Sequence, residues 1–294
     1  MKVNSSLALE IYVSFILSNL NKHLKISYYY VMKKMGFILL SLLLLLSVTA
    51  PAQNTDREGT NILYKNEFVI GPVGFHSYGF STVARSGKNI TYDNKRIIEF
   101  ELVNIRHPKE LKQTNEFLPP LIDAPNPKAY YYGKQNSFFA IRTGVGQMRL
   151  IYEKAKKNGV QVRYLYLGGF SLGVVKPYYL NILYLDEARN VYFILTEKYD
   201  SSIPDNTNKF LDWYTIYGAA GFSEGWKEVR FLPGAYGKLG LNFEWASYDD
   251  LVKSVEVGIA FDIYPKKVPI MIIQDNKLWF PSLYINMILG WKWE

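Results

Sequence analysis

The stretch SVEVGIAFDIY, from Ser254 to Tyr264, alternates between apolar residues and small or charged ones. A period of two is typical of a β-strand whose two faces meet different surroundings. The same alternation recurs from Gly234 to Trp245 and from Leu283 to Trp293, whereas no long run at helical spacing follows residue 53. The apolar face of the first stretch carries Val255, Val257, Ile259, Phe261 and Ile263. The sequence therefore predicts an all-β protein.

Counting the alternating segments predicts eight strands, and an even number places both chain ends on the same side of a barrel. Long strands with one smooth apolar face and aromatic residues near their ends match strands that cross a bilayer. We therefore expect an antiparallel transmembrane β-barrel of about eight strands in the outer membrane, with long extracellular loops. The expected strands are Glu67–Phe75, Tyr78–Arg85, Arg96–Ile105, Ser137–Tyr152, Val160–Leu172, 234–246, 252–264 and 279–293.

The largest expected outer loop spans 173–233. Within it, Tyr178–Leu185 and Val191–Thr196 alternate and predict a hairpin that extends beyond the membrane. We place Trp213–Phe231 in this loop as well, because a ninth strand would break the even count. Pro72 removes a hydrogen-bond donor from the first strand, so a bulge between Gly71 and Gly74 is expected there.

The N-terminal part of the chain looks like a targeting segment and not like part of the fold. Residues 32–52 have two lysines, an apolar core and an Ala50-Pro51-Ala52 cleavage site, which predicts a secretory signal peptide. Residues 1–31 are expected to be an upstream extension from a start codon placed too early. The barrel domain is expected at 53–294, and no cysteine follows the cleavage site to carry a lipid anchor.

Composition excludes several kinds of chemistry. The 294 residues include no Cys and 3 His, so disulfides, thiolate metal sites and catalytic cysteines are excluded, and no metal or cofactor site is predicted. The net charge of +8 falls to +4 without residues 1–52, with 29 basic and 25 acidic side chains remaining, which does not indicate nucleic acid. Lys154–Lys157 is expected at a solvated hairpin tip, with contact to anionic lipid or lipopolysaccharide as the functional alternative.

The polar faces of the strands predict a charged barrel interior. An eight-stranded barrel has room inside for side chains only, so buried charges there must pair with one another. We expect this lumen charge network to close the barrel, with a narrow polar pore or proton path as the alternative. Its expected members are Glu99, Glu101, Arg142, Arg163, Lys238, Glu244, Glu256, Asp262 and Lys292.

The end of the chain resembles the aromatic strand that the outer-membrane assembly machinery reads in bacterial barrels. Leu289, Trp291 and Trp293 form this expected C-terminal barrel signal, although Glu294 follows the last aromatic residue.

An enzyme is the second hypothesis, and the sequence identifies no complete catalytic set for it. His76, Ser77 and His107 follow predicted strands and are expected at the outer rim, where a His and a Ser could act on a lipid. No carboxylate partner can be assigned to them from sequence. The run from Gly168 to Gly173 lacks the following helix and Lys-Ser/Thr of a nucleotide loop, and predicts a crowded strand end instead.

Several segments resemble a family of exported β-barrel-like proteins from Bacteroidetes with no established activity. These segments are Asn104–Glu110, Tyr132–Ser137, Gly168–Gly173 with Lys176-Pro177, Thr196–Asp200 and Tyr264–Met271. The resemblance implies an outer-membrane location and carries over no catalytic residue. Since most of these segments fall in the expected outer loops, we expect a closed barrel that acts as a surface-binding, scaffolding or assembly-accessory protein. A lipid-modifying enzyme with rim histidines and a soluble periplasmic ligand-binding protein are the alternatives.

Overall fold

The computed structural model describes residues 64–115, 126–153, 159–189, 191–203, 205–245, 250–273 and 275–294. Residues 60–294 belong to one compact unit. The expected signal peptide at 32–52, the upstream extension at 1–31 and the lysines of 154–157 lie outside the described residues.

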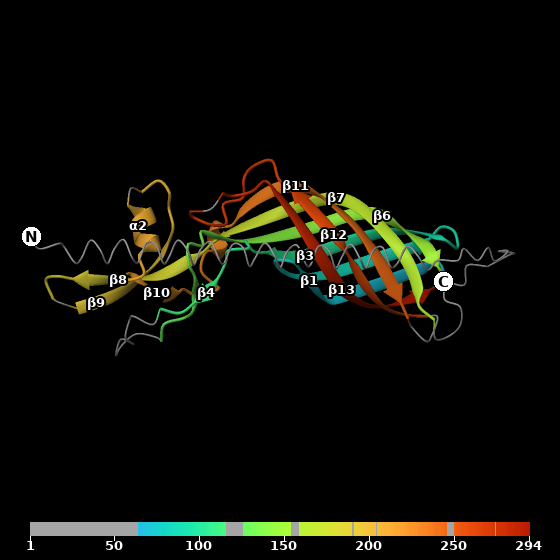
Figure 1. The fold of residues 1–294 in the computed structure, drawn as a ribbon, viewed down its shortest axis with the longest axis horizontal. Helices are drawn as coiled ribbons and strands as arrows, with labels where there is room; N and C mark the ends of the chain where they lie inside the picture. The colour runs from blue at the N-terminus through green and yellow to red at the C-terminus, as the bar shows by residue number, and fades with distance from the viewer. Residues whose placement is uncertain are drawn as a thin grey trace, which may run out of the picture. The chain divides into compact units, whose positions relative to one another are not determined.

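Eight antiparallel strands close into a barrel, in the order β1-β13-β12-β11-β7-β6-β3-β2 (Figure 1). The barrel closes because β1 pairs with β2 on one side and with the last strand, β13, on the other. The prediction of an all-β antiparallel barrel of eight strands is therefore confirmed. The strands are β1 (Asn66–His76), β2 (Gly79–Asn89), β3 (Asn94–Ile105), β6 (Asn136–Tyr152), β7 (Gln161–Pro177), β11 (Arg230–Glu244), β12 (Leu251–Ile263) and β13 (Trp279–Trp293).

Several strands are longer than the sequence pattern predicted. Strand β2 continues to Asn89 and β3 begins at Asn94, so the expected turn of residues 86–95 shrinks to four residues. Strands β7 and β11 remain paired from Gln161 with Glu244 up to Val175 with Arg230. The large connection consequently spans 178–229 and not 173–233, because ladder hydrogen bonds continue past the end of the alternating pattern.

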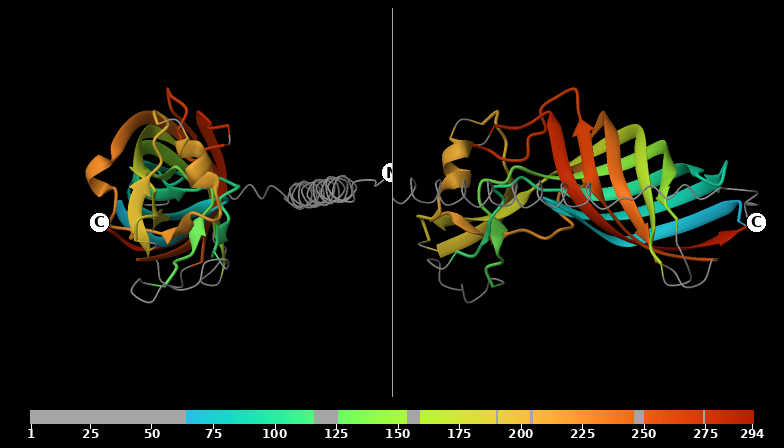
Figure 2. Two further views of the ribbon diagram at one scale, coloured as in Figure 1. Left: turned by 90° about the vertical axis from the view of Figure 1, so that its left-hand side faces the viewer. Right: turned by 45° about the vertical axis from the view of Figure 1, so that its right-hand side comes forward.

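The long connections gather beyond one end of the barrel, whereas the chain's C-terminus lies at the other end (Figures 1 and 2). We call the described residues of 106–135, 178–229 and 264–278 the crown. The predicted hairpin is confirmed as β8 and β9, and β10 pairs with β8 to complete a three-stranded sheet. The crown contains β4 (Lys112–Gln113), β5 (Tyr130–Tyr131), β8 (Tyr179–Asp186), β9 (Val191–Lys198), α2 (Asn206–Leu211), β10 (Ile216–Ala219) and the 3₁₀ turn η1 (Trp226–Glu228).

The expected bulge lies in β1. Its register shifts against β13 between Ile70 and Val73, and against β2 between Gly71 and Gly74, which brackets Pro72. A side chain at Gly74 would lie 2.1 Å from Asn286 Oδ1 and 2.3 Å from Ser81 Oγ, so only glycine fits this inward position. The bulge absorbs the proline and changes which later residues of the strand face inward.

Helices contribute little to the described part of the chain. None of the helices there is long and apolar enough to cross a membrane.

Candidate functional site

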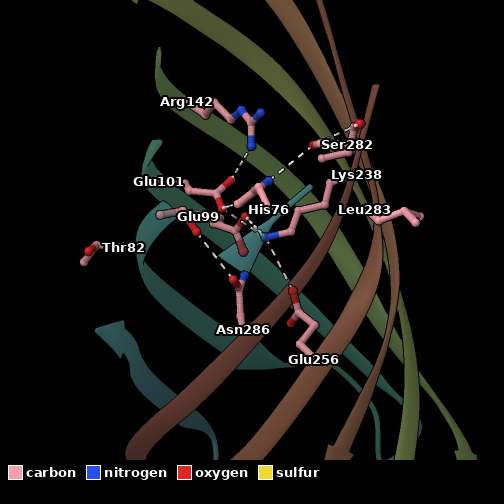
Figure 3. A network of polar contacts seen from close by, with 12 residues as sticks. His76, Thr82, Glu99, Glu101, Arg142, Lys238, Glu256, Ser282, Leu283 and Asn286 are labelled. Atoms are coloured by element: carbon pink, nitrogen blue, oxygen red, sulfur yellow. Dashed lines mark hydrogen bonds and ion pairs between the residues drawn. The ribbon is translucent and has the colours of Figure 1, made fainter. Parts of the chain in front are cut away.

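The barrel encloses a network of charged side chains that its alternating strands direct inward. Along β3, Lys95, Glu99 and Glu101 are buried, whereas Ile98 and Phe100 between them are exposed on the outer face. Since successive side chains of a strand point to opposite faces, each polar position of the pattern adds a group to the interior. Figure 3 shows part of this network, with Lys238 lying between Glu99 and Glu256.

The middle of the network contains two cations and two carboxylates. Lys238 Nζ donates to Glu99 Oε1 at 2.8 Å and lies 3.4 Å from Glu256 Oε1. Arg85 Nε donates to Glu99 Oε2 at 2.8 Å, and its Nη1 lies 2.7 Å from Glu256 Oε2. All four side chains are 2% exposed or less, and they come from strands β2, β3, β11 and β12. These ion pairs therefore connect opposite parts of the wall.

A second cluster lies on the crown side of the first. Arg142 donates from Nη1 to Glu101 Oε2 at 2.9 Å and from Nε to Asp262 Oδ1 at 3.0 Å. Ser171 Oγ donates to Asp262 Oδ1 at 3.0 Å and lies 2.7 Å from the hydroxyl of Tyr264. The guanidinium of Arg142 is thus held by two carboxylates, in the multidentate geometry that makes charge-assisted bonds strong.

A third cluster lies toward the end of the barrel that holds the C-terminus. There Lys95 pairs with Glu67, and Lys292 pairs with Glu244. Arg163 is also buried in this part of the interior, on β7. The interior is therefore lined with charge along most of its length.

The structure places all nine residues of the expected lumen charge network inside the barrel. It gathers them in three clusters, of which the first two are joined by Lys238 Nζ and Glu101 Oε1 at 3.9 Å. Sequence reasoning missed Glu67, Arg85 and Lys95, which make the interior set six acidic and six basic side chains. Arg85 stood at the expected end of its strand and Lys95 in an expected turn. Continuing the period-two pattern of β2 and β3 by a few residues would have found both.

The expected position of His76 at the outer rim is wrong. Its side chain is 3% exposed and lies inside the barrel, with Nδ1 3.2 Å from Ser282 Oγ and Nε2 3.2 Å from Glu101 Oε1. The bulge at Pro72 shifts the alternation by one residue, so Phe75 faces outward and His76 inward. Ser77 is exposed and pairs with the backbone of Leu283, so it does not meet the imidazole.

The hydroxyl of Ser282, the imidazole of His76 and the carboxylate of Glu101 form a chain of the type that acyl-transfer enzymes use. The imidazole also stacks on Tyr284, with ring centroids 5.9 Å apart, and Glu101 is shared with Arg142. A lipid substrate would have to enter the enclosed interior to reach these groups. Their surroundings favour a structural role.

His107 lies in the crown, where its backbone N–H donates to Glu110 and its Nδ1 accepts from Lys109. Burial lowers the pKa of His107, and Glu110 offsets part of that effect. Among the described residues, no group of three or more His, Asp or Glu side chains is arranged to hold a metal ion.

An apolar plug closes the crown end of the barrel above the charges. Val268, Ile270 and Met271 of the β12–β13 connection pack against Phe138 and Val103 of the wall. Backbone bonds hold this connection in the mouth, since Gln135 N donates to Ile270 O at 2.8 Å and Ile272 N donates to Gly133 O at 2.9 Å. Buried apolar groups and ionic groups, most of them paired, line the interior along most of its length, which favours a closed barrel.

The crown has a core of its own, made of Tyr130, Leu180, Ile182, Phe210 and Ile216. Exposed apolar side chains surround this core, among them those of Tyr192, Tyr214 and Phe222 on its surface. Burial raises the pKa of Tyr178 to about 12 beside this core, so its phenol stays protonated at neutral pH. The crown is therefore an ordered structure and not a set of loose loops.

Comparison with known proteins finds similarity in solved structures alone. No protein-family model matches the chain, and no curated protein matches it. The crystal structure of Ail, the attachment invasion locus protein of Yersinia pestis, aligns with a TM-score of 0.36 and 8% identity over 79% of this chain and 100% of that chain. The same protein in complex with the heparin analogue sucrose octasulfate gives the same values. Neisserial surface protein A aligns with a TM-score of 0.35 and 10% identity, over 80% of this chain and 100% of that chain.

At these scores and identities the likeness supports no inference about ligand or activity. The resemblance to a Bacteroidetes family stays a prediction, because no family model matches.

Proposed function

We propose that the chain is an outer-membrane β-barrel that is closed to solutes and holds the crown at the cell surface as a surface-binding, scaffolding or assembly-accessory element. The observation that carries this proposal is the outer face of the wall. Every barrel strand contributes exposed large apolar side chains to it, such as Phe80 on β2, Phe100 on β3 and Val145 on β6. A soluble monomer rarely exposes an apolar surface that surrounds the whole molecule, whereas a bilayer requires one.

The height of this apolar surface fits a membrane. Trp279 and Trp291 of β13 lie near its two edges, twelve residues apart. At about 3.3 Å per residue this is about 40 Å along the strand, or roughly 30 Å along the barrel axis for a tilt of about 40°. Aromatic pairs lie near both edges, with Phe261 beside Trp279 at 5.9 Å and Phe68 beside Trp291 at 5.8 Å between ring centroids. Aromatic side chains prefer the two interfaces of a bilayer.

The contents of the interior support placing the function in the crown. Ion pairs and the apolar plug occupy the path that a transported solute would use. The crown supplies exposed aromatic and cationic groups on an ordered core, which are the groups that surface recognition uses. Its proposed partners are outer-membrane lipid or lipopolysaccharide and an envelope protein. Leu289, Trp291 and Trp293 are proposed to engage the assembly machinery during insertion.

Fractionation of cells that express the full chain tests the membrane location. We expect the protein in the sarkosyl-insoluble envelope fraction, with a gel mobility that changes on boiling because the folded barrel survives detergent. Recovery from the soluble periplasmic fraction would favour the soluble ligand-binding alternative.

The enzyme is the second candidate, and the Ser282, His76 and Glu101 chain is the observation that favours it. His76→Ala and His107→Ala should leave the lipid A and phospholipid profile unchanged if the barrel is not catalytic. A profile that changes with His76→Ala and not with His107→Ala would support catalysis inside the barrel.

A further inference from the structure

Lys176 is a buried cation on the outer side of the barrel wall. It lies near the crown end of β7 and is 4% exposed. Its Nζ atom lies 4.9 Å from the ring centroid of Phe222 and 5.5 Å from that of Trp226. Within the described part of the chain, this ammonium forms no hydrogen bond to an oxygen and no ion pair. Its identified neighbours are the two aromatic faces and Glu224, whose charge acts on the ammonium without forming an ion pair.

Aromatic contacts satisfy such a cation only in part. An ammonium has three N–H donors, and burial of a charge is costly unless an acceptor or a counter-charge compensates it. Cation–π contacts stabilise an ammonium and leave its N–H donors for another acceptor. Lys134 makes a useful comparison, because it lies over Tyr131 at 4.6 Å and also pairs with Glu110 at 2.7 Å. Lys176 has Glu224 nearby but forms no such ion pair with it.

The register of the wall places Lys176 at the crown-side edge of the apolar surface. Two positions before it, Val174 pairs with Phe139 on one side and with Phe231 on the other. Trp226 stacks on Phe139 with centroids 6.5 Å apart. Phe231 of β11 is 65% exposed, and Phe170, farther down β7 from Lys176, is 50% exposed. An amphiphile lying along this face would meet an ammonium at its head and apolar side chains along its tails.

We propose that Lys176, between Phe222 and Trp226, binds the phosphate group of a lipid in the outer leaflet, whose acyl chains pack on Phe231 and Phe170. The phosphate oxygens accept the hydrogen bonds that the protein leaves unmade, and the apolar wall holds the chains. This inference rests on the proposed membrane location. It adds which chemical group of the lipid the protein binds. Lipid A and glycerophospholipids share the phosphate, whereas inorganic phosphate lacks the chains.

Native mass spectrometry of the full-length protein in dodecyl maltoside, a detergent without phosphate, tests the site. We expect wild-type protein to bind lipid A and phosphatidylglycerol, to bind dephosphorylated lipid A at least tenfold more weakly, and to bind inorganic phosphate weakly. If wild-type protein binds phosphorylated and dephosphorylated lipid A equally well, that result alone overturns the proposal.

Variants then locate the site. Lys176→Met should weaken lipid A binding about tenfold, and Lys176→Arg should restore most of it because the charge returns. Lys227→Met is the matched control, since Lys227 is exposed in η1 beside Trp226, and it should change binding less than twofold. If Lys176→Met does not fold, as judged by the absence of a heat-modifiable band, Lys176→Gln is used in its place. The comparison of phosphorylated and dephosphorylated lipid A on wild-type protein tests the proposal in either case. Unchanged binding in the Lys176 variant would overturn the proposal.

The proposed function and this inference fail in different ways. A wild-type protein that is absent from the envelope fraction contradicts the membrane location itself. A protein that is in the envelope and that binds lipids without regard to their phosphate contradicts the Lys176 site alone.

Discussion

Lys238 of β11 donates a hydrogen bond of 2.8 Å to Glu99 of β3 inside the barrel, and both side chains are fully enclosed. Removing one partner of a buried ion pair typically costs about 3–5 kcal/mol, because the other charge stays buried without compensation. Lys238→Met leaves Glu99 and Glu256 to share the single cation Arg85, so one carboxylate charge is uncompensated and the free energy of unfolding should fall by about that amount. Urea unfolding followed by the gel shift between folded and unfolded forms measures it.

The control for this prediction is Lys253→Met, because Lys253 is exposed on the outer face of β12 and should change stability by less than about 0.5 kcal/mol. The double variant Lys238→Met with Glu99→Gln should recover part of the loss. A single variant as stable as wild type would show that the interior charges do not act as a paired network.

Asn276 fixes the plug in the barrel mouth. Its Oδ1 accepts from Ile270 N at 2.8 Å and Met271 N at 3.3 Å, and its Nδ2 donates to Met271 O at 3.2 Å. Asn276→Ala leaves Met271 N without this acceptor and leaves Ile270 N with the carbonyl of Val268 alone, at about 1–3 kcal/mol. Hydrogen exchange should then lose roughly tenfold or more protection at Ile270 and Met271, whereas exposed Asp275→Ala should leave protection unchanged. Equal protection in both variants would contradict the role of Asn276.

The C-terminal aromatic residues are predicted to act during insertion as well as in the finished wall. Trp291→Ser with Trp293→Ser should reduce the amount of heat-modifiable protein in the envelope several-fold. Trp279→Ser, at the other end of the same strand, removes a similar exposed ring and should have a smaller effect. Equal losses in the two variants would indicate general destabilisation and not a recognition signal.

The pairing of Glu197 with Lys209 makes the crown sensitive to acid. Burial raises the pKa of Glu197, while hydrogen bonds from Lys209 and Tyr184 and the charge of Lys209 lower it by more, so its pKa lies below the ordinary value. A carboxyl with a lowered pKa stabilises the fold above its unfolded pKa of about 4.3 and loses that contribution as the pH falls through the folded pKa.

We therefore expect protection factors in β8 and β9 to fall as the pH drops below about 4.3. Because both side chains are more than a quarter exposed, solvent screening keeps the effect small. Glu197→Gln should lower protection at neutral pH and remove most of its pH dependence. A wild-type crown whose protection is constant over this range would contradict the pairing.

Alternation predicted the barrel because a period of two reports directly which residues share a face. It identified nine interior charges. His76 was misplaced because the expected strand ended at Phe75, whereas β1 continues to His76 and the bulge turns this side chain inward. Pro72 signalled the bulge itself. Gly74 faces inward after the bulge, so alternation from Gly74 directs Phe75 outward and His76 inward.

Alternation predicted the β8–β9 hairpin of the crown, but not how the crown and the plug pack. The core around Phe210 joins side chains from β5, β8, β10 and α2, and these contacts depend on tertiary packing and not on a local period. The plug likewise places Ile270 against Phe138, residues far apart in the sequence. The environment of Lys176 could not be predicted either, since its aromatic neighbours Phe222 and Trp226 come from a different segment of the chain.

Spin labels on the outer face test most directly whether the barrel wall meets lipid. The chain has no cysteine, so a single substitution labels one position. In liposomes, labels at Ile285→Cys and Ile259→Cys should collide often with oxygen, which partitions into lipid, and rarely with a water-soluble nickel chelate. A label at Glu187→Cys in the crown should show the reverse. Nickel collisions at Ile285→Cys as frequent as those at Glu187→Cys would contradict a membrane-spanning barrel.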